Sequence, residues 1–291
     1  MPELPEVETI RTGLEPHLAG RTFERVEISD ARLTRPHDPR EVAAELEGET
    51  VAAVERRGKY LVVRFETGRV LLIHLRMTGS LLRASREAAA GHPYVRAVVK
   101  LDNGSDVAYR DVRRFGTWLL LEPGELEPYL AERIGKEPLG TGFTARSLTD
   151  RLARRTAPIK AVVLDQRVFA GVGNIYADEA LWWARLHPLR PANTLSADEL
   201  TALVRGIRRA LRLGIARQGA TLRDYRNANG QAGEMQAEFR VYGREGEPCT
   251  RCGTPIDKIR AGGRGTWYCP NCQRLGASSS LPSRSSRQSS V

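Results

Sequence analysis

The chain carries four cysteines in one short segment, and these are Cys249, Cys252, Cys269 and Cys272. They form two C-x-x-C pairs separated by sixteen residues. Two such pairs can place four thiolates around one Zn²⁺ in a tetrahedral structural site that leaves no open position for chemistry. A redox dithiol is the alternative, but two matched pairs in so short a segment favour zinc. The sequence therefore predicts one structural zinc, at a hairpin whose tip presents Arg260 and Arg264 between glycines to a phosphate.

A glycine-rich turn precedes a second candidate site. The run GVGNIY from Gly171 to Tyr176 stands directly before a predicted helix that ends near Arg185. Free backbone N–H groups and the helix dipole can hold a phosphate at such a turn, and the amide of Asn174 would add a donor. Arg155 and Lys160 supply further positive charge nearby. A turn that only caps a helix, beside a solvated basic face, would give the same pattern.

The charge balance agrees with a polyanionic partner. The chain has 45 Lys+Arg against 35 Asp+Glu, a formal net charge of +10. Such a surplus favours nucleic acid through phosphate neutralisation, although a basic solvated surface would look the same. The sequence contains neither a run of about 20 apolar residues nor a signal-peptide core, which predicts no contact with a membrane. The clustered cysteines favour a reducing cytoplasm over scattered disulfides.

The elements that must position these residues change character along the chain. Val7, Ile10 and Leu14 recur at helical spacing behind Pro5, which suits a first helical turn. Alternating apolar runs between turn residues then predict antiparallel strands; these runs are 60–65, 70–75, 94–101, 107–109 and 117–121. We expect a β-sandwich with a flanking helix over residues 1–130.

The second half of the chain is predicted to be helical. A Gly- and Pro-containing linker is expected over 131–150, and a helical unit over 151–237. Ser196 and Glu199 form a capping box that opens a long helix, and Gly219 is a plausible stop. A zinc finger over 238–274 and a Ser-rich disordered tail over 275–291 complete an α+β fold.

Five motifs in order resemble the formamidopyrimidine-DNA glycosylases of bacteria. They are PELPEVET, HLRMTG, DVRRFG, GVGNIYADEAL, and VYGREGEPC with the cysteines and GGRGT. Relatives of the endonuclease VIII type begin PEGPE, whereas this chain has Leu4, which favours the purine-specific branch. The resemblance implies a helix-two-turn-helix domain, damaged double-stranded DNA as partner, a monomer without an obligate protein partner, and a cytoplasmic location near the nucleoid. It also implies base removal followed by β- and δ-elimination.

Pro2 is the nucleophile that the resemblance implies. Loss of the initiator methionine would free its nitrogen, and an α-amino group titrates near 8, about two units below a lysine amine. A secondary amine bonded to the sugar C1′ gives an iminium ion, which acidifies the neighbouring C2′ proton. A plain helix start is the alternative role for a proline here.

The resemblance assigns four further catalytic residues. Glu3 would protonate the sugar ring oxygen, and Glu6 would order water or position the amine, unless it only favours the helix dipole. Lys59 would transfer protons and contact phosphate. Arg264 would grip the phosphates that flank the damaged nucleotide, as a group that stays charged.

A wedge must replace the base that is rotated out of the helix. Met77 and Phe115 resemble the family's apolar wedge, and Arg113 would hydrogen-bond the orphaned cytosine; without the motifs, Met77 and Phe115 would be read as core. The resemblance also implies phosphate-contacting or supporting positions, which are His74, His92, Arg114 and Arg155.

The loop 225–239 is where the resemblance places contacts with the flipped base. Its residues 233–236 (GEMQ) do not reproduce the aromatic-containing sequence of some family members, so the preferred oxidised purine stays open. Two other functions compete with an oxidised-purine enzyme. They are an oxidised-pyrimidine glycosylase of the endonuclease VIII type and a DNA-binding protein that recognises lesions without cutting.

Overall fold

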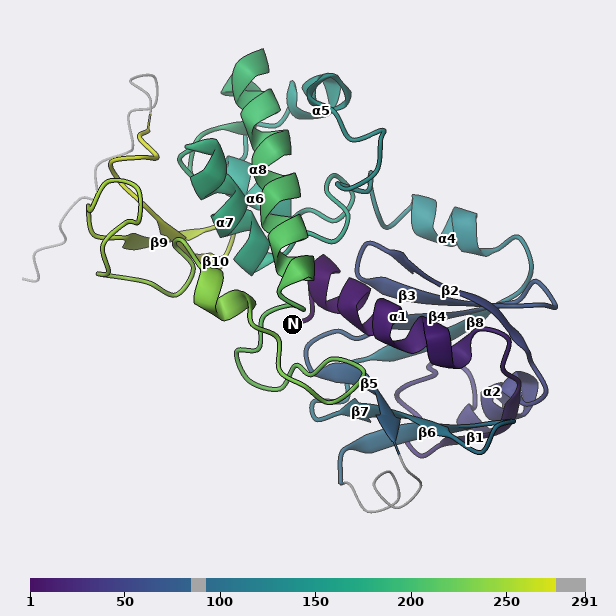
Figure 1. The fold of residues 1–291 in the computed structure, drawn as a ribbon. Helices are drawn as coiled ribbons and strands as arrows, with labels where there is room; N and C mark the ends of the chain where they lie inside the picture. Colours follow the sequence, from purple (N-terminus) through teal and green to yellow (C-terminus); the bar gives the residue numbers. More distant parts are fainter. Residues whose placement is uncertain (85–92, 276–291) are drawn as a thin grey trace, which may run out of the picture.

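The computed structural model describes residues 1–84 and 93–275, arranged as a β-sandwich, a helical unit and a hairpin unit (Figure 1). The helices are α1 (Leu4–Leu18), α2 (Pro39–Leu46), α4 (Leu126–Ala131), α5 (Ala145–Leu152), α6 (Ile159–Leu164), α7 (Asn174–Ala184) and α8 (Ala197–Ala216), with 3-10 turns η1 (Ala192–Thr194) and η2 (Met235–Glu238). The strands are β1 (Phe23–Ile28), β2 (Val51–Arg57), β3 (Tyr60–Phe65), β4 (Val70–His74), β5 (Gly79–Ala84), β6 (Val95–Leu101), β7 (Asp106–Asp111), β8 (Thr117–Leu121), β9 (Asp257–Ala261) and β10 (Arg264–Tyr268). The predicted α+β class is confirmed.

Two four-stranded antiparallel sheets form the sandwich, with strand orders β1-β6-β7-β5 and β2-β3-β4-β8. Because successive side chains of a strand point to opposite faces, Val63 and Ile73 enter the core from one sheet, and Val99 and Tyr109 enter it from the other. The outer face of the second sheet is covered by α4, where Val62 packs in a separate small core.

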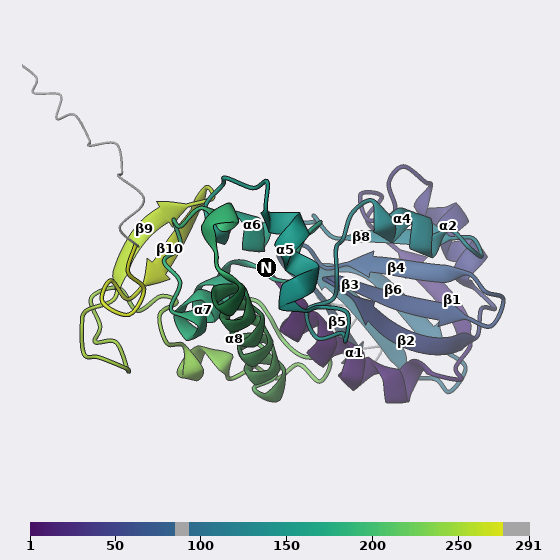
Figure 2. The same ribbon diagram turned by 90° about the horizontal axis from the view of Figure 1, so that it is seen from above.

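Helix α1 joins the sandwich to the helical unit. Pro5 lies in its first turn, as the sequence predicts. Val7, Ile10 and Leu14 pack in the sandwich core, whereas Leu4 belongs to the core of the helical unit. The beginning of the chain is therefore held between the two units, at the centre of the molecule (Figure 2).

The helical unit is built around the pair α7 and α8. The predicted capping box is present, since Ser196 and Glu199 exchange hydrogen bonds at the start of α8. Gly206 lets the helices approach closely, because a Cβ there would lie 2.5 Å from the carbonyl oxygen of Ala180. Helix α5 begins at Ala145, inside the predicted linker, so that segment is not coil throughout.

The hairpin unit consists of β9 and β10 and the cysteine segment before and after them. Its small core includes Val241, Ile256 and Cys269, together with Trp182 from α7. Among residues 1–84 and 93–275, none of the helices combines the length and apolar character needed to cross a bilayer.

Candidate active site

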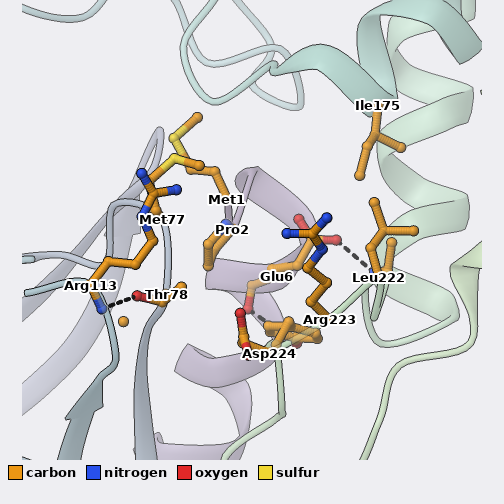
Figure 3. A pocket seen from close by; sticks show the side chains of 13 residues that line it. Met1, Pro2, Glu6, Met77, Thr78, Arg113, Ile175, Leu222, Arg223 and Asp224 are labelled. Carbon is orange, nitrogen blue, oxygen red and sulfur yellow. Dashed lines mark hydrogen bonds between the residues drawn. The ribbon is translucent and has the colours of Figure 1, made fainter. Parts of the chain in front are cut away.

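A pocket of about 270 Å³ surrounds the beginning of the chain. Its walls come from the start of α1, the β4–β5 and β7–β8 loops, α7 and the segment after α8. Pro2 is buried and lines this pocket. Figure 3 shows Met77 and Arg113 on one side of Pro2 and Arg223 on the other. The pocket therefore brings residues from distant parts of the chain around the predicted nucleophile.

The carboxylate of Glu3 occupies the N-terminus of α7. It accepts backbone hydrogen bonds from Gly173 at 2.8 Å, Ile175 at 3.0 Å and Tyr176 at 3.3 Å. These N–H groups have no partner within a helix, and the helix dipole favours a negative charge beside them. Gly173 is required here, because a Cβ would collide with the carboxylate. The prediction that the backbone N–H groups of this turn bind a phosphate is therefore wrong, because they bind the carboxylate of Glu3 instead.

Glu6 lies one helical turn further along and is 2% exposed. It accepts hydrogen bonds from the phenol of Tyr176 at 2.7 Å and from the backbone N–H groups of Ala220 and Glu3, both at 2.8 Å. Burial, reinforced by the nearby charge of Glu3, raises the pKa of Glu6 to about 7. Near neutral pH this carboxyl can therefore both accept and donate a proton.

Lys59 lies in the tight turn between β2 and β3, where Gly58 adopts a φ of +58°. Its side chain is buried, and burial lowers the pKa of the amine. The negative charges of Glu3 and Glu6 oppose that shift, whereas Arg264 adds to it. Lys59 thus lies within electrostatic range of Glu3, Glu6 and Arg264, three of the other predicted catalytic residues. The fifth, Pro2, lies in the same region because it directly precedes Glu3 in the chain.

The tip of the hairpin is fastened to α7 by Asn174, which was predicted to contact phosphate, and by Asp178, which was not predicted. The amide of Asn174 donates to the carbonyl oxygen of Gly265 at 3.0 Å, and Asp178 accepts from the backbone N–H of Trp267 at 3.2 Å. Lys160 is 0% exposed, and its Nζ lies 2.6 Å from Oδ1 of Asp178. Lys160 is therefore fully buried in an ion pair and is not open to a phosphate. Asn174 is half-buried and holds the hairpin that carries the exposed Arg264, and its contact with phosphate stays a prediction.

The predicted wedge residues lie on two neighbouring loops. Phe115 is 52% exposed, and the guanidinium of Arg113 lies 4.9 Å from the centre of its ring. The backbone N–H of Arg113 donates to the hydroxyl of Thr78 at 2.9 Å, which joins its loop to the one that carries Met77. An exposed aromatic side chain on a braced loop can enter a base stack.

The other residues predicted to contact DNA are buried or ion-paired, or lie outside the described part of the chain. His74 is buried, and burial lowers its pKa to about 3, so it is a neutral group whose Nδ1 accepts the N–H of Arg76. Arg114 is paired with Asp30 at 2.6 Å. Arg155 is likewise paired, with Asp165 at 3.0 Å. His92 lies outside the described residues.

Sequence reasoning missed the segment directly after α8, which supplies several pocket residues, namely Ala220, Leu222, Arg223, Asp224 and Tyr225. The predicted lesion loop starts only at Tyr225. The helix stop at Gly219, whose φ is +82°, was the available signal, because the chain must turn there toward the pocket.

The four cysteine Sγ atoms all lie within 4.8 Å of one another. The indole N–H of Trp182 donates to the Sγ of Cys249 at 3.4 Å, which is the outer-sphere contact expected around a thiolate ligand. Four sulfur donors gathered in this way fit a tetrahedral zinc ion with no open position.

Three family models match the chain in succession. Residues 1–118 match the formamidopyrimidine-DNA glycosylase N-terminal domain, and residues 134–226 match its H2TH domain. Residues 246–275 match the zinc finger found in FPG and IleRS. Together with the clustered sulfurs, this last match confirms the predicted structural zinc.

Relatives and solved structures agree with these matches. The formamidopyrimidine-DNA glycosylase of Herpetosiphon aurantiacus is 46% identical over 275 residues, which cover 94% of this chain and 100% of the relative. A Lactococcus lactis FPG mutant in complex with a Fapy-dG containing DNA aligns with a TM-score of 0.88 and 37% identity, over 94% of this chain and 100% of that one. MutM in complex with carbocyclic 8-oxo-G containing DNA aligns with a TM-score of 0.87, 37% identity and the same coverage. The chain therefore belongs to the formamidopyrimidine-DNA glycosylase family.

Proposed function

We propose that this protein removes oxidised purines from duplex DNA in base-excision repair and then cuts the strand, with the nitrogen of Pro2 as nucleophile. The observation that carries the proposal is the burial of Pro2 in a pocket beside Glu6, with Glu3 and Lys59 close by. The relatives bound to Fapy-dG and 8-oxo-G DNA support the choice of oxidised purines. We place the enzyme in the cytoplasm, with access to the nucleoid.

The reaction begins with removal of Met1, which frees the nitrogen of Pro2. This nitrogen attacks C1′ of the deoxyribose and loses its proton, while the bond from C1′ to the base breaks and the base leaves with a proton. The carboxylate of Glu3 takes up the proton that this nitrogen releases and passes it to the ring oxygen O4′, so the sugar opens and a cationic iminium forms at C1′. Glu6, with a pKa of about 7, relays protons to and from this centre.

Strand scission follows from the iminium, which draws electrons from C2′. Lys59 accepts the C2′ proton, because its lowered pKa increases the fraction of neutral amine, and the 3′ phosphate leaves by β-elimination. Loss of a further proton expels the 5′ phosphate by δ-elimination. Arg264 grips the flanking phosphates during both steps. Phe115 and Met77 fill the gap in the stack, and Arg113 bonds the unpaired base.

Borohydride trapping tests the proposal. A duplex with 8-oxoguanine opposite cytosine is incubated with the full chain, and the mass of the N-terminal peptide is measured in parallel. We expect a covalent adduct at the terminal nitrogen of a peptide that starts at Pro2. An adduct that maps to another residue, or strand cutting by a chain that retains Met1, would overturn the proposal. A thymine glycol duplex in the same assay distinguishes an oxidised-pyrimidine enzyme.

A further inference from the structure

A second groove, of about 650 Å³, runs along the outer face of α8. It is lined by six arginines, which are Arg205, Arg208, Arg209, Arg212, Arg217 and Arg240. The groove has a single carboxylate, that of Glu238 in η2. We call it the arginine groove. Its charge makes an anionic ligand the natural occupant.

The positive charge of the groove is only partly neutralised within the protein. Arg205, Arg209 and Arg212 recur every three or four residues on one face of α8, where like charges repel. In the part of the chain that the structure describes, Arg205 and Arg212 are exposed and have no ion-pair or hydrogen-bond partner. These two guanidinium groups are therefore available to an external anion.

The protein already places one carboxylate in this groove. Glu238 lies 2.6 Å from Arg217 and 3.5 Å from Arg240. The arrangement thus shows how a carboxylate is bound in this groove, next to the exposed guanidinium groups of Arg205 and Arg212, which are free to bind more of them.

Aromatic and apolar side chains in the groove argue against nucleic acid as the occupant. The guanidinium of Arg209 lies 3.6 Å from the centre of the Trp183 ring, so a base cannot stack on that face of the indole. Leu213 and Ala216 line the groove between the arginines. Such a surface suits an apolar side chain that stands between carboxylates better than it suits a sugar-phosphate backbone.

We propose that the arginine groove binds an acidic segment of a partner protein, in which carboxylates flank at least one apolar side chain. The stretch from Arg205 to Arg217 rises about 18 Å along the helix axis. An extended segment of about six residues covers that length. In Figure 2, α8 lies at the opposite edge of the helical unit from α6 and the β9–β10 turn. The segment therefore binds without displacing DNA held by Arg264.

A fluorescent hexapeptide of sequence DDFDDF tests the proposal by anisotropy. The full chain is first saturated with a duplex that contains a tetrahydrofuran abasic analogue, so that the DNA site is filled. We expect saturable binding that weakens as salt is raised, and no binding of NNFNNF. The double variant Arg205→Glu/Arg212→Glu should weaken binding roughly tenfold or more. Arg25→Glu, which changes an exposed arginine of β1, should leave the affinity for the peptide unchanged.

The uncharged double variant Arg205→Gln/Arg212→Gln should give an intermediate loss, and thermal melting checks that every variant is folded. Absence of saturable binding would overturn the proposal, and so would equal affinity in the charge-reversed variant. Tighter binding of single-stranded oligothymidine, lost in the same variant, would also overturn it and would assign the groove to nucleic acid.

Discussion

The phenol of Tyr176 donates a hydrogen bond to Oε1 of Glu6 at 2.7 Å and so joins α7 to α1. Both side chains are buried, and burial raises the pKa of Glu6 to about 7. The hydrogen bond acts in the other direction, because it stabilises the ionised carboxylate. The protonation of Glu6 therefore depends on a residue from the helical unit.

Replacement of this phenol should change the pH dependence of the reaction. In Tyr176→Phe the ionised form of Glu6 loses a donor, so its pKa should rise above its present value of about 7. We expect the acid limb of the pH–rate profile to move to higher pH, with roughly a tenfold loss of rate at neutral pH. Rates of 8-oxoguanine release across pH provide the check. A loss of the same size at every pH would contradict the assignment, and Tyr268→Phe, in the hairpin unit, serves as control.

Glu6 should also make the protein less stable as pH rises. Its pKa of about 7 in the folded chain exceeds the ordinary value of 4.5, so the folded state holds the extra proton between these pH values. The free energy of unfolding contributed by this group therefore falls from about pH 4.5 to about pH 7. Glu6→Gln should remove a pH dependence on the order of 3 kcal/mol. Urea unfolding at pH 5 and pH 8 measures it, and identical pH dependence in both proteins would refute the expectation.

Gly173→Ala should disable the reaction by displacing Glu3. The added Cβ would collide with the carboxylate, which must then leave the N–H groups of α7. We expect a loss of base release of at least about a hundredfold, together with destabilisation of about 1–3 kcal/mol. Single-turnover rates and thermal melting measure the two effects. Gly142→Ala is the matched control, because a Cβ there meets nothing within 4 Å; an active Gly173→Ala protein would argue against a role for Glu3.

Phe115→Ala should impair the enzyme without unfolding it. The ring is 52% exposed, so its removal creates no cavity in the core. Without the ring, no side chain at this position replaces the stacking of the base that is rotated out of the duplex. Excision from duplex DNA should therefore slow by roughly tenfold or more. An abasic site in single-stranded DNA needs no such filling, so its cleavage should be spared. Equal losses on both substrates would remove Phe115 from the wedge.

Removal of zinc should affect DNA binding more than folding. The four cysteines support a hairpin with its own small core, separate from the cores of the sandwich and the helical unit. Chelated protein should keep its far-ultraviolet circular dichroism but lose about tenfold or more in affinity for lesion duplex, because Arg264 is no longer fixed. A gel shift that is unchanged after verified zinc loss would be the contrary result.

Local patterns predicted much of this fold. The strands β3 and β8 have the expected limits because each is a run of mostly apolar residues, with Arg64 the one charged residue between them. Ser196 caps α8 through contacts only three residues apart. The strands β1, β2 and β5 and the helix α2 were missed. Charged residues interrupt β1 and β2, whose outer faces are exposed, so neither shows a clean alternation.

The geometry of the site depends on contacts between residues that are far apart in the sequence, and no local sequence pattern indicates such contacts. The family resemblance predicted the catalytic roles of Glu3, Glu6 and Lys59, and their residue types agree with those roles. Nothing near Glu3 in the sequence indicates that its carboxylate caps a helix that begins at Asn174. Lys160 was read as a surface cation, because its partner Asp178 lies on another helix and the burial of both depends on the packing of α6 against α7.

The hydrogen bonds of Glu3 to Gly173 and of Glu6 to Ala220 have a consequence for biosynthesis. The first residues to leave the ribosome are among the last to be fixed, since their partners are translated some 170 and 214 positions later. A nascent chain thus has its reactive end long before it has the helices that hold it. Synthesis must pass Ala220 before the pocket is assembled, so an unfinished chain has no competent site with which to nick the chromosome.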